Sequence, residues 1–197
     1  MIRVFRRSAL AILLILSSSS YADNYVINAS KTNVRFSLEG LEGLNASSIT
    51  GGFYHIDGVL QYSPSSKTGN ISLTVPIKTL DTGNEVVNTK LTSKGFFDSQ
   101  KFPLAHFQST KWHFNNHQTN PKVTQVDGNL TLHGHTHPVS LKASRFNCYK
   151  SAAQADNICS GRFTTTIDRT KWDINKFALF GNTKHLTLNI QVAATRQ

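Results

Sequence analysis

Residues 126–139 read VDGNLTLHGHTHPV, and this stretch decides the fold of the chain. In its first half apolar residues, among them Leu130 and Leu132, alternate with polar ones. A two-residue period of this kind is typical of a β-strand with one face on a core and the other in water. The His133-Gly134 pair that follows predicts a turn. The stretch therefore predicts a strand that runs into a turn.

The same period recurs along the chain, at residues 34–38, 71–75, 163–167 and 186–192. Clusters of turn-forming residues separate these runs and predict further turns. These clusters are Gly51-Gly52, Asp57-Gly58, Pro64-Ser65-Ser66, Asn115-Asn116 and Asp127-Gly128. The chain is therefore expected to be an antiparallel β protein.

One segment, residues 84–97, departs from the two-residue period. Val87 and Leu91 follow a helical spacing there, which predicts a short helix ending near Gly95. No helical pattern alternates with the strands, so a parallel βαβ architecture is disfavoured. About eight strands with one helix favour a closed barrel, because closure removes exposed strand edges. The predicted fold is all-β with one short helix, an eight-stranded antiparallel barrel whose interior holds side chains or one ligand.

The chain has 197 residues, of which 39% are hydrophobic and 16% charged, a composition that excludes a disordered chain. Arg3, Arg6 and Arg7 precede an apolar run at residues 9–16, and a small-x-small sequence ends at Ala22. This three-part pattern predicts a secretory signal peptide over residues 1–22. A single domain over residues 23–197 follows, and no apolar run in it reaches the roughly 18 residues of a transmembrane helix.

The chain is basic, with a formal net charge of +10. Removal of the signal segment takes away three arginines and no acidic residue, which leaves +7. The remaining basic residues are scattered from Lys31 to Arg196 without long runs. We interpret them as surface charge that keeps the protein soluble, and expect no nucleic-acid partner.

The chain has two cysteines, Cys148 and Cys159, separated by ten small or polar residues. An exported chain meets an oxidising compartment, in which two cysteines tend to pair. We expect a disulfide that joins the arms of a long hairpin. A redox or metal pair is the alternative, but the CxxC spacing is absent.

Five blocks, in order along the chain, match the sequence pattern of a known family. They are residues 25–38 (YVINASKTNVRFSL), 51–58, 80–110, 126–139 and 167–172 (IDRTKW). On these blocks the chain resembles the polyisoprenoid-binding, YceI-like family of bacterial periplasmic proteins. The most specific is residues 126–139, similar to that family's G-x-L-T-L-x-G-x-T-x-P-V. Residues 87–91 (VNTKL) depart from the family's R-D-x-H-L.

The resemblance implies an extended, lipocalin-like barrel of eight antiparallel strands in the periplasm. It implies a long apolar tunnel that holds a long-chain amphiphilic lipid, such as an isoprenoid or a quinone tail. It implies binding or transport and not catalysis, no cofactor other than the lipid, and it allows a homodimer.

The candidate tunnel residues are inward-facing aromatic and aliphatic side chains of the expected strands. They are Val34, Phe36, Phe53, Leu73, Phe107, Leu130, Phe163 and Leu188. Phe96 and Phe97 are candidates for closing one mouth of the tunnel. The alternative is that all of these residues form an ordinary packed core.

Two other functions compete with lipid binding. His133, His135 and His137 have the spacing of a strand face, and three imidazoles suit Zn²⁺ or Cu²⁺, which would make the protein a metal-binding module. Gly134 and Pro138 favour a turn instead. The other competitor is an unliganded barrel that acts through surface contacts. An enzyme is not expected, because the chain has no G-x-S-x-G elbow and no phosphate-binding glycine loop.

Overall fold

The computed structural model describes residues 22–41, 46–116, 121–150, 157–176 and 184–197. The expected signal segment, residues 1–22, lies outside the described residues except for Ala22. The strands are β1 (Asp23–Ile27), β2 (Asn33–Leu41), β3 (Ala46–Phe53), β4 (Asp57–Ser63), β5 (Thr68–Pro76), β6 (Leu104–Phe114), β7 (Val123–Leu132), β8 (His135–Lys150), β9 (Asn157–Asp168) and β10 (His185–Arg196). The helices are η1 (Ile77–Thr79), α1 (Glu85–Thr92) and η2 (Arg169–Trp172), of which η1 and η2 are 3₁₀ turns.

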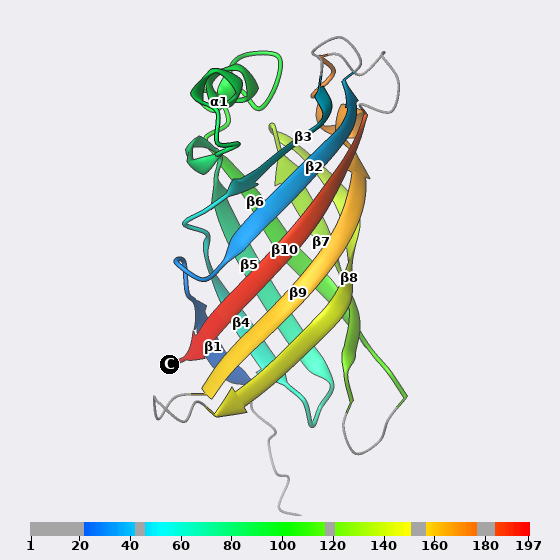
Figure 1. Cartoon of the computed structure of the whole chain (residues 1–197). Helices are drawn as coiled ribbons and strands as arrows, with labels where there is room; N and C mark the ends of the chain where they lie inside the picture. Colours follow the sequence, from blue (N-terminus) through cyan, green and yellow to red (C-terminus); the bar gives the residue numbers. More distant parts are fainter. Residues whose placement is uncertain (1–21, 42–45, 117–120, 151–156, 177–183) are drawn as a thin grey trace, which may run out of the picture.

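These strands close into an eight-stranded antiparallel barrel with α1 at one end (Figure 1). β1 and β2 both pair with β10, at different levels, and so act as one interrupted strand of the barrel. β4 and β3 pair with β1 and β2 in the same way and form the next interrupted strand. The sequence-based prediction of an all-β barrel of eight strands with one helix is confirmed.

The wall of the barrel is irregular near α1, where β3 pairs with β2 and stands at the end of the order of hydrogen-bonded strands. There the backbone of Gly52 bridges Asp81, with N–H to O distances of 2.8 and 2.9 Å. A Cβ atom on Gly51 would lie 2.7 Å from the Phe36 ring and 2.8 Å from the Asp81 carbonyl oxygen. The prediction of a turn at Gly51-Gly52 is therefore wrong. These glycines lie inside β3, where the absence of a side chain permits the close approach.

The helix α1 begins where Asn84 caps it. The Asn84 side-chain oxygen accepts hydrogen bonds from the backbone N–H groups of Val86 and Val87 at 3.0 and 3.2 Å, a regular N-cap. The helix ends at Thr92, short of the predicted end near Gly95. Gly95 has a positive φ of 92° and lies in the turn that follows, which turns the chain back toward the barrel.

Two other predicted turns are also wrong, because Asp57-Gly58 begins β4 and Asp127-Gly128 lies in the middle of β7. A Cβ atom on Gly128 would lie 2.5 Å from the Phe107 ring, so glycine is needed there to make room for that ring. The turn comes later, at His133-Gly134, where both residues have positive φ angles of 50° and 79°. That is the geometry of a two-residue hairpin turn, and the prediction of this turn is confirmed.

The hairpin of β8 and β9 carries the disulfide. Cys148 and Cys159 lie directly opposite each other in the register of the two strands, and a disulfide joins them. The prediction from the sequence is confirmed. Cys148 lies two residues before the end of β8, and β8 ends at the end of the barrel opposite α1 (Figure 1).

A polar cluster on the outer face of β6, β7 and β8 makes stability depend on pH. The Asp127 carboxylate accepts hydrogen bonds from Ser140 and Gln125, both at 2.7 Å, and lies 2.6 Å from His113 Nε2. The hydrogen bond from Ser140, followed by that from His113, lowers the pKa of Asp127. A lowered pKa in the folded state stabilises the protein above the ordinary aspartate pKa of about 3.9, and this contribution is lost as the pH falls through the folded-state value.

We therefore expect the free energy of unfolding, measured in urea, to fall between about pH 5 and pH 3, and to fall less in Asp127→Asn. Ser140→Ala removes the hydrogen bond that lowers the pKa of Asp127 most. The loss of stability on acidification should therefore be complete at a higher pH in this variant. An Asp127→Asn variant with the same pH dependence as the unmodified chain would contradict this assignment.

Candidate functional site

An apolar cavity occupies the half of the barrel next to α1. Its volume is about 80 Å³. One water needs about 10–15 Å³, so this is a true void and not a packing gap. Its lining comprises Val34, Phe53, Leu73, Val75, Ile77, Phe97, Ala105, Phe107, Leu130, Leu132, Val139, Leu141, Thr165, Ile167, Leu186, Leu188 and Ile190.

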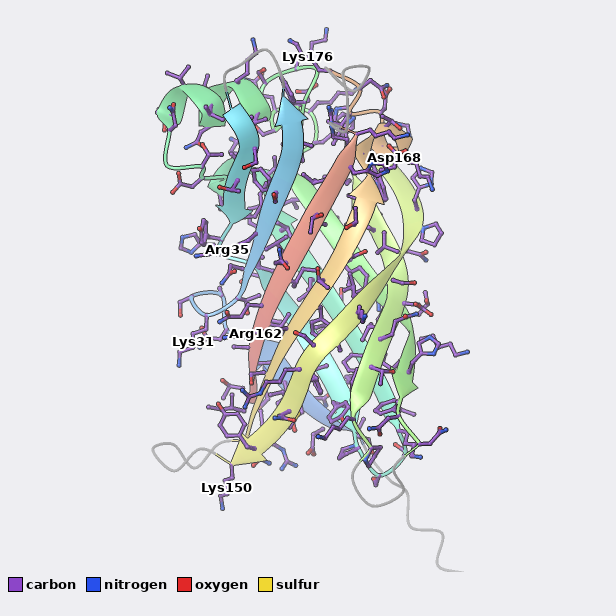
Figure 2. The ribbon with its side chains drawn as sticks, turned by 45° about the vertical axis from the view of Figure 1, so that its right-hand side comes forward. Lys31, Arg35, Lys150, Arg162, Asp168 and Lys176 are labelled. Atoms are coloured by element: carbon purple, nitrogen blue, oxygen red, sulfur yellow. A yellow bond between two sulfur atoms is a disulfide. The ribbon has the colours of Figure 1, made fainter. Side chains whose placement is uncertain are left out.

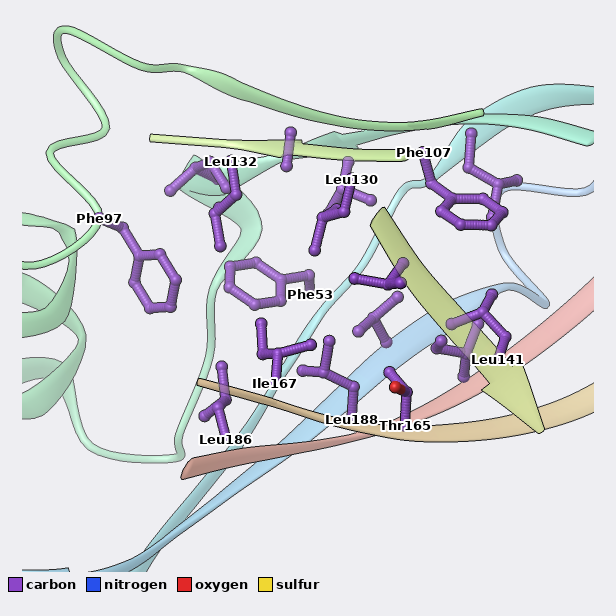
Figure 3. A pocket seen from close by; sticks show the side chains of 17 residues that line it. Phe53, Phe97, Phe107, Leu130, Leu132, Leu141, Thr165, Ile167, Leu186 and Leu188 are labelled. Atoms are coloured by element: carbon purple, nitrogen blue, oxygen red, sulfur yellow. The ribbon is translucent and has the colours of Figure 1, made fainter. Parts of the chain in front are cut away.

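The strands build this lining through their alternation. Along β10, for example, Leu186, Leu188 and Ile190 all point into the barrel, while the residues between them point out. Figure 3 shows hydrocarbon side chains converging from all sides, with Thr165 as the one member that carries an oxygen. A cavity of this composition favours a hydrocarbon chain over any polar molecule.

The other half of the barrel is filled by rings, which form a floor under the cavity. The ring centroids of Tyr62 and Phe146 are 4.9 Å apart, those of Trp112 and Phe146 5.4 Å, and those of Phe146 and Phe163 6.2 Å. Glycine makes this packing possible, because a Cβ atom on Gly69 would lie 2.4 Å from the Trp112 ring. We call Tyr62, Trp112, Phe146 and Phe163 the aromatic floor.

A smaller void, the upper compartment, lies between the cavity and α1. Its volume is about 20 Å³, room for about one water. Phe97 and Leu186 line both spaces, so the two adjoin each other. The rings of Phe53 and Phe97 meet edge to face at 5.4 Å where the spaces join. The lining comprises Phe36, Leu38, Ile49, Leu91, Phe96, Phe97, Arg169, Ile174 and Leu186.

One member of this lining, Arg169, carries a charge. Its side chain is only 3% exposed, and its Nη1 and Nη2 atoms donate hydrogen bonds to the carbonyl oxygens of Ile174 and Lys176 at 2.5 and 2.8 Å. Burial lowers the pKa of Arg169, and the charge of the neighbouring Asp168 opposes that effect. An arginine remains protonated through such shifts, so a fixed positive charge faces an apolar space.

The eight candidate tunnel residues fall at three levels of the barrel. Six of them line the main cavity: Val34, Phe53, Leu73, Phe107, Leu130 and Leu188. Phe36 lines the upper compartment, and Phe163 belongs to the aromatic floor. Of the two candidates for the mouth, Phe97 lines both spaces and Phe96 lines the upper compartment.

Two residues of note were not among the candidates. Thr165 lies two residues after Phe163 in β9, and the alternation of that strand is the signal that identifies it. Arg169 is the first residue of η2, beyond the end of β9, so no strand alternation points to it.

The three side chains of the histidine tract have separate surroundings in the structure. His133 Nδ1 lies 3.0 Å from the Trp172 carbonyl oxygen, and the His137 ring packs edge to face on the Trp172 ring at 5.1 Å. His135 is exposed at the start of β8. Within the described ranges, no three His, Cys, Asp or Glu side chains are grouped as a metal ion would require. The structure therefore offers no support for the metal-binding alternative.

Helices in the described part of the chain are short, and none is both long and apolar enough to cross a membrane.

Comparison with known proteins identifies the family. Residues 25–194 match the model of the YceI-like domain, so the chain belongs to the YceI-like family. A relative from Photorhabdus laumondii, UPF0312 protein plu2095, is 31% identical over 132 residues, which is 66% of this chain. The aligned part is also 66% of that relative, so the match spans about two thirds of its length.

Solved structures share the fold at low sequence identity. BcnA of Burkholderia cenocepacia has a TM-score of 0.65 and 15% identity, covering 85% of this chain and 98% of BcnA. A polyisoprenoid binding domain from Saccharophagus degradans, implicated in plant cell wall breakdown, has a TM-score of 0.59 and 12% identity. That match covers 88% of this chain and 98% of the domain. Both likenesses concern the barrel architecture.

Proposed function

We propose that this protein binds a long-chain isoprenoid, or a similar amphiphilic lipid such as a quinone, with the apolar tail inside the barrel. The observation that carries the proposal is the cavity lined by hydrocarbon side chains from β2, β3 and every strand from β5 to β10. Membership of the YceI-like family and the polyisoprenoid binding of the Saccharophagus domain agree with it. We infer a binding protein and not an enzyme.

Burial of the tail supplies the binding energy. Each buried CH₂ group contributes about 0.8 kcal/mol, so even a short tail gains several kcal/mol on leaving water. A tail of roughly 40 carbons would exceed the affinity ceiling of about 18–21 kcal/mol if all of it were buried, so lost flexibility must absorb part of the gain. The volume of the cavity is also small for such a tail. The long tail therefore needs side chains such as Phe97 to move, or part of it stays outside.

We propose that the protein is a lipid carrier of the bacterial periplasm, exported by a signal peptide that is cleaved after Ala22. The Cys148–Cys159 disulfide supports export, because such bonds persist in oxidising compartments. The pattern of residues 1–22 supports it independently.

Native mass spectrometry of the mature protein, purified from the periplasm of its own host, tests the proposal. We expect an adduct of more than a few hundred daltons that dissociates as an intact prenyl quinone, prenyl phosphate or related lipid. After extraction with organic solvent, the empty protein should take up such a lipid again at one per chain.

A variant that fills the cavity tests whether the lipid binds inside it. Ala105→Phe puts a ring into the cavity from β6 and should lower lipid uptake. Lipid that remains bound at the same stoichiometry in this variant would lie on the outer surface. A protein that is empty as isolated and takes up no lipid afterwards would refute the proposed function.

A further inference from the structure

We propose that the outer face of β2, β10, β9 and β8 binds to a membrane surface that carries anionic phospholipids. This inference goes beyond the proposed function, because it concerns the outside of the barrel and does not depend on what fills the cavity. The observation that carries it is a group of four positive side chains that the strand register brings together, two of them directly opposite each other.

Strand pairing places these four charges in two adjacent rows across the barrel wall. The first row runs through Arg35, Asn189, Thr164 and Lys142, and the second through Asn33, Gln191, Arg162 and Arg145. The basic face is the name we give to the four exposed cations of these rows, Arg35, Lys142, Arg145 and Arg162. The other four members are uncharged amides and hydroxyls, so the two rows hold four positive charges and no carboxylate.

The pairing of Arg145 with Arg162 works against the stability of the sheet, because like charges directly opposite each other repel. A β-bulge between Ala143 and Arg145 sets this register and leaves Ser144 exposed beside the pair. Within the described ranges, no side chain of the basic face makes a hydrogen bond or an ion pair. The described part of the chain therefore leaves the repulsion uncompensated, and an anion from outside would relieve it.

A shallow groove on the surface follows the same two rows. Its lining includes Arg35, Arg162, Asn189 and Gln191. A guanidinium binds a phosphate group through two parallel hydrogen bonds, and side-chain amides donate further ones. The phosphate of a phospholipid head group fits this lining, because its free oxygens accept hydrogen bonds from both kinds of donor.

The charge extends along the side of the barrel, which favours a surface over one small ligand. Figure 2 shows Lys31 and Lys150 on the same side as Arg35 and Arg162, toward the end away from α1. Tyr149, next to Lys150, is 53% exposed, and tyrosine is enriched where membranes meet water. A small anion contacts only part of this stretch. A membrane presents many separate phosphates in one plane, and each Lys or Arg near it adds to the attraction.

The test is sedimentation of the full mature protein with two kinds of vesicle, one of phosphatidylcholine alone and one that contains about one third phosphatidylglycerol. We expect binding to the anionic vesicles to be at least about tenfold tighter in about 0.1 M NaCl, and most of this preference to be lost in about 0.5 M NaCl. Equal binding to both kinds of vesicle, or no binding to the anionic ones, would overturn the inference.

Charge reversal separates the basic face from the net charge of the chain. Arg35→Glu/Arg162→Glu should weaken binding to the anionic vesicles at least about thirtyfold. The matched control is Lys67→Glu/Lys78→Glu, which changes the net charge equally at exposed positions on either side of β5, across the barrel from β9. It should weaken binding less than about threefold, because charges beyond the Debye length of about 10 Å are screened. Equal losses in both variants would mean that net charge alone drives binding, and would overturn the inference.

The single variant Arg162→Glu shows whether a loss of binding comes from unfolding. It places a carboxylate opposite Arg145, so its melting temperature should rise while its binding to anionic vesicles falls. A lower melting temperature would mean that Arg162 is held by partners within the fold, which contradicts the free charge on which the inference rests.

Inorganic phosphate distinguishes a membrane surface from a discrete anion site. Phosphate should release the protein from anionic vesicles no better than NaCl of the same ionic strength, because screening weakens a set of separate contacts equally. Release by phosphate at a far lower ionic strength would indicate a site for a soluble anion and overturn the membrane assignment.

Discussion

Replacing Thr165 by aspartate is expected to lower the affinity for a prenyl lipid by about a hundredfold or more at neutral pH. Thr165 is the member of the cavity lining whose side chain carries an oxygen, and it faces hydrocarbon side chains (Figure 3). A carboxylate at this position is stable only if water solvates it or a proton neutralises it. An apolar tail would displace that water, so binding would carry the cost of a buried charge. The measurement is a titration of the lipid-free protein with the lipid identified by native mass spectrometry.

The matched control is Thr166→Asp on the neighbouring, exposed position of β9, which should leave binding unchanged. Thr165→Val removes the hydroxyl and keeps the shape, so it should bind as tightly as the unmodified chain. Circular dichroism of Thr165→Asp, Thr166→Asp and Thr165→Val should first establish that each barrel is folded. A folded Thr165→Asp protein that binds lipid normally would exclude the cavity as the site.

Loss of the Cys148–Cys159 disulfide is expected to lower the melting temperature by about 6–12 °C. The bond closes a loop with a sequence separation of 11. A loop of this size is worth about 3 kcal/mol in the chain-entropy model, and each kcal/mol shifts the melting temperature of a domain of this size by about 2–4 °C. Calorimetry with and without reductant gives the shift.

The double variant Cys148→Ala/Cys159→Ala should melt at the temperature of the reduced protein and respond to no reductant. Because Cys148 lies near the end of β8 that is opposite α1, lipid affinity at a temperature well below melting should be the same in all three forms. A reduced protein that melts where the oxidised one does would mean that the β8–β9 register alone keeps the hairpin closed.

The alternation of the sequence was a sound guide to which side chains face inward. Leu186, Leu188 and Ile190 all line the cavity, as the two-residue period of residues 186–192 predicts. The barrel and its strand count follow from the same pattern, and the disulfide was expected from the signal-like pattern of residues 1–22. These features depend on short-range periodicity and on simple rules of closure, which are visible in a single sequence.

The level of each residue along the barrel could not be predicted. Phe36 and Phe163 have the same alternation as Phe107, yet only Phe107 lines the main cavity. The level depends on the strand register, and register depends on bulges such as the shift between Ala143 and Arg145. The pairs Gly51-Gly52, Asp57-Gly58 and Asp127-Gly128 were misinterpreted for a related reason, because a glycine that allows a close approach inside a strand looks the same in sequence as a glycine in a turn.

The aromatic floor has a consequence for the kind of lipid that fits. If a lipid tail enters as proposed, the packed rings of Tyr62, Trp112, Phe146 and Phe163 would stop it at a fixed depth. Carbons up to that depth would add to the affinity, and each further carbon would remain in water. The barrel would then select lipids by tail length, and replacing one ring of the floor by a smaller side chain would change the preferred length.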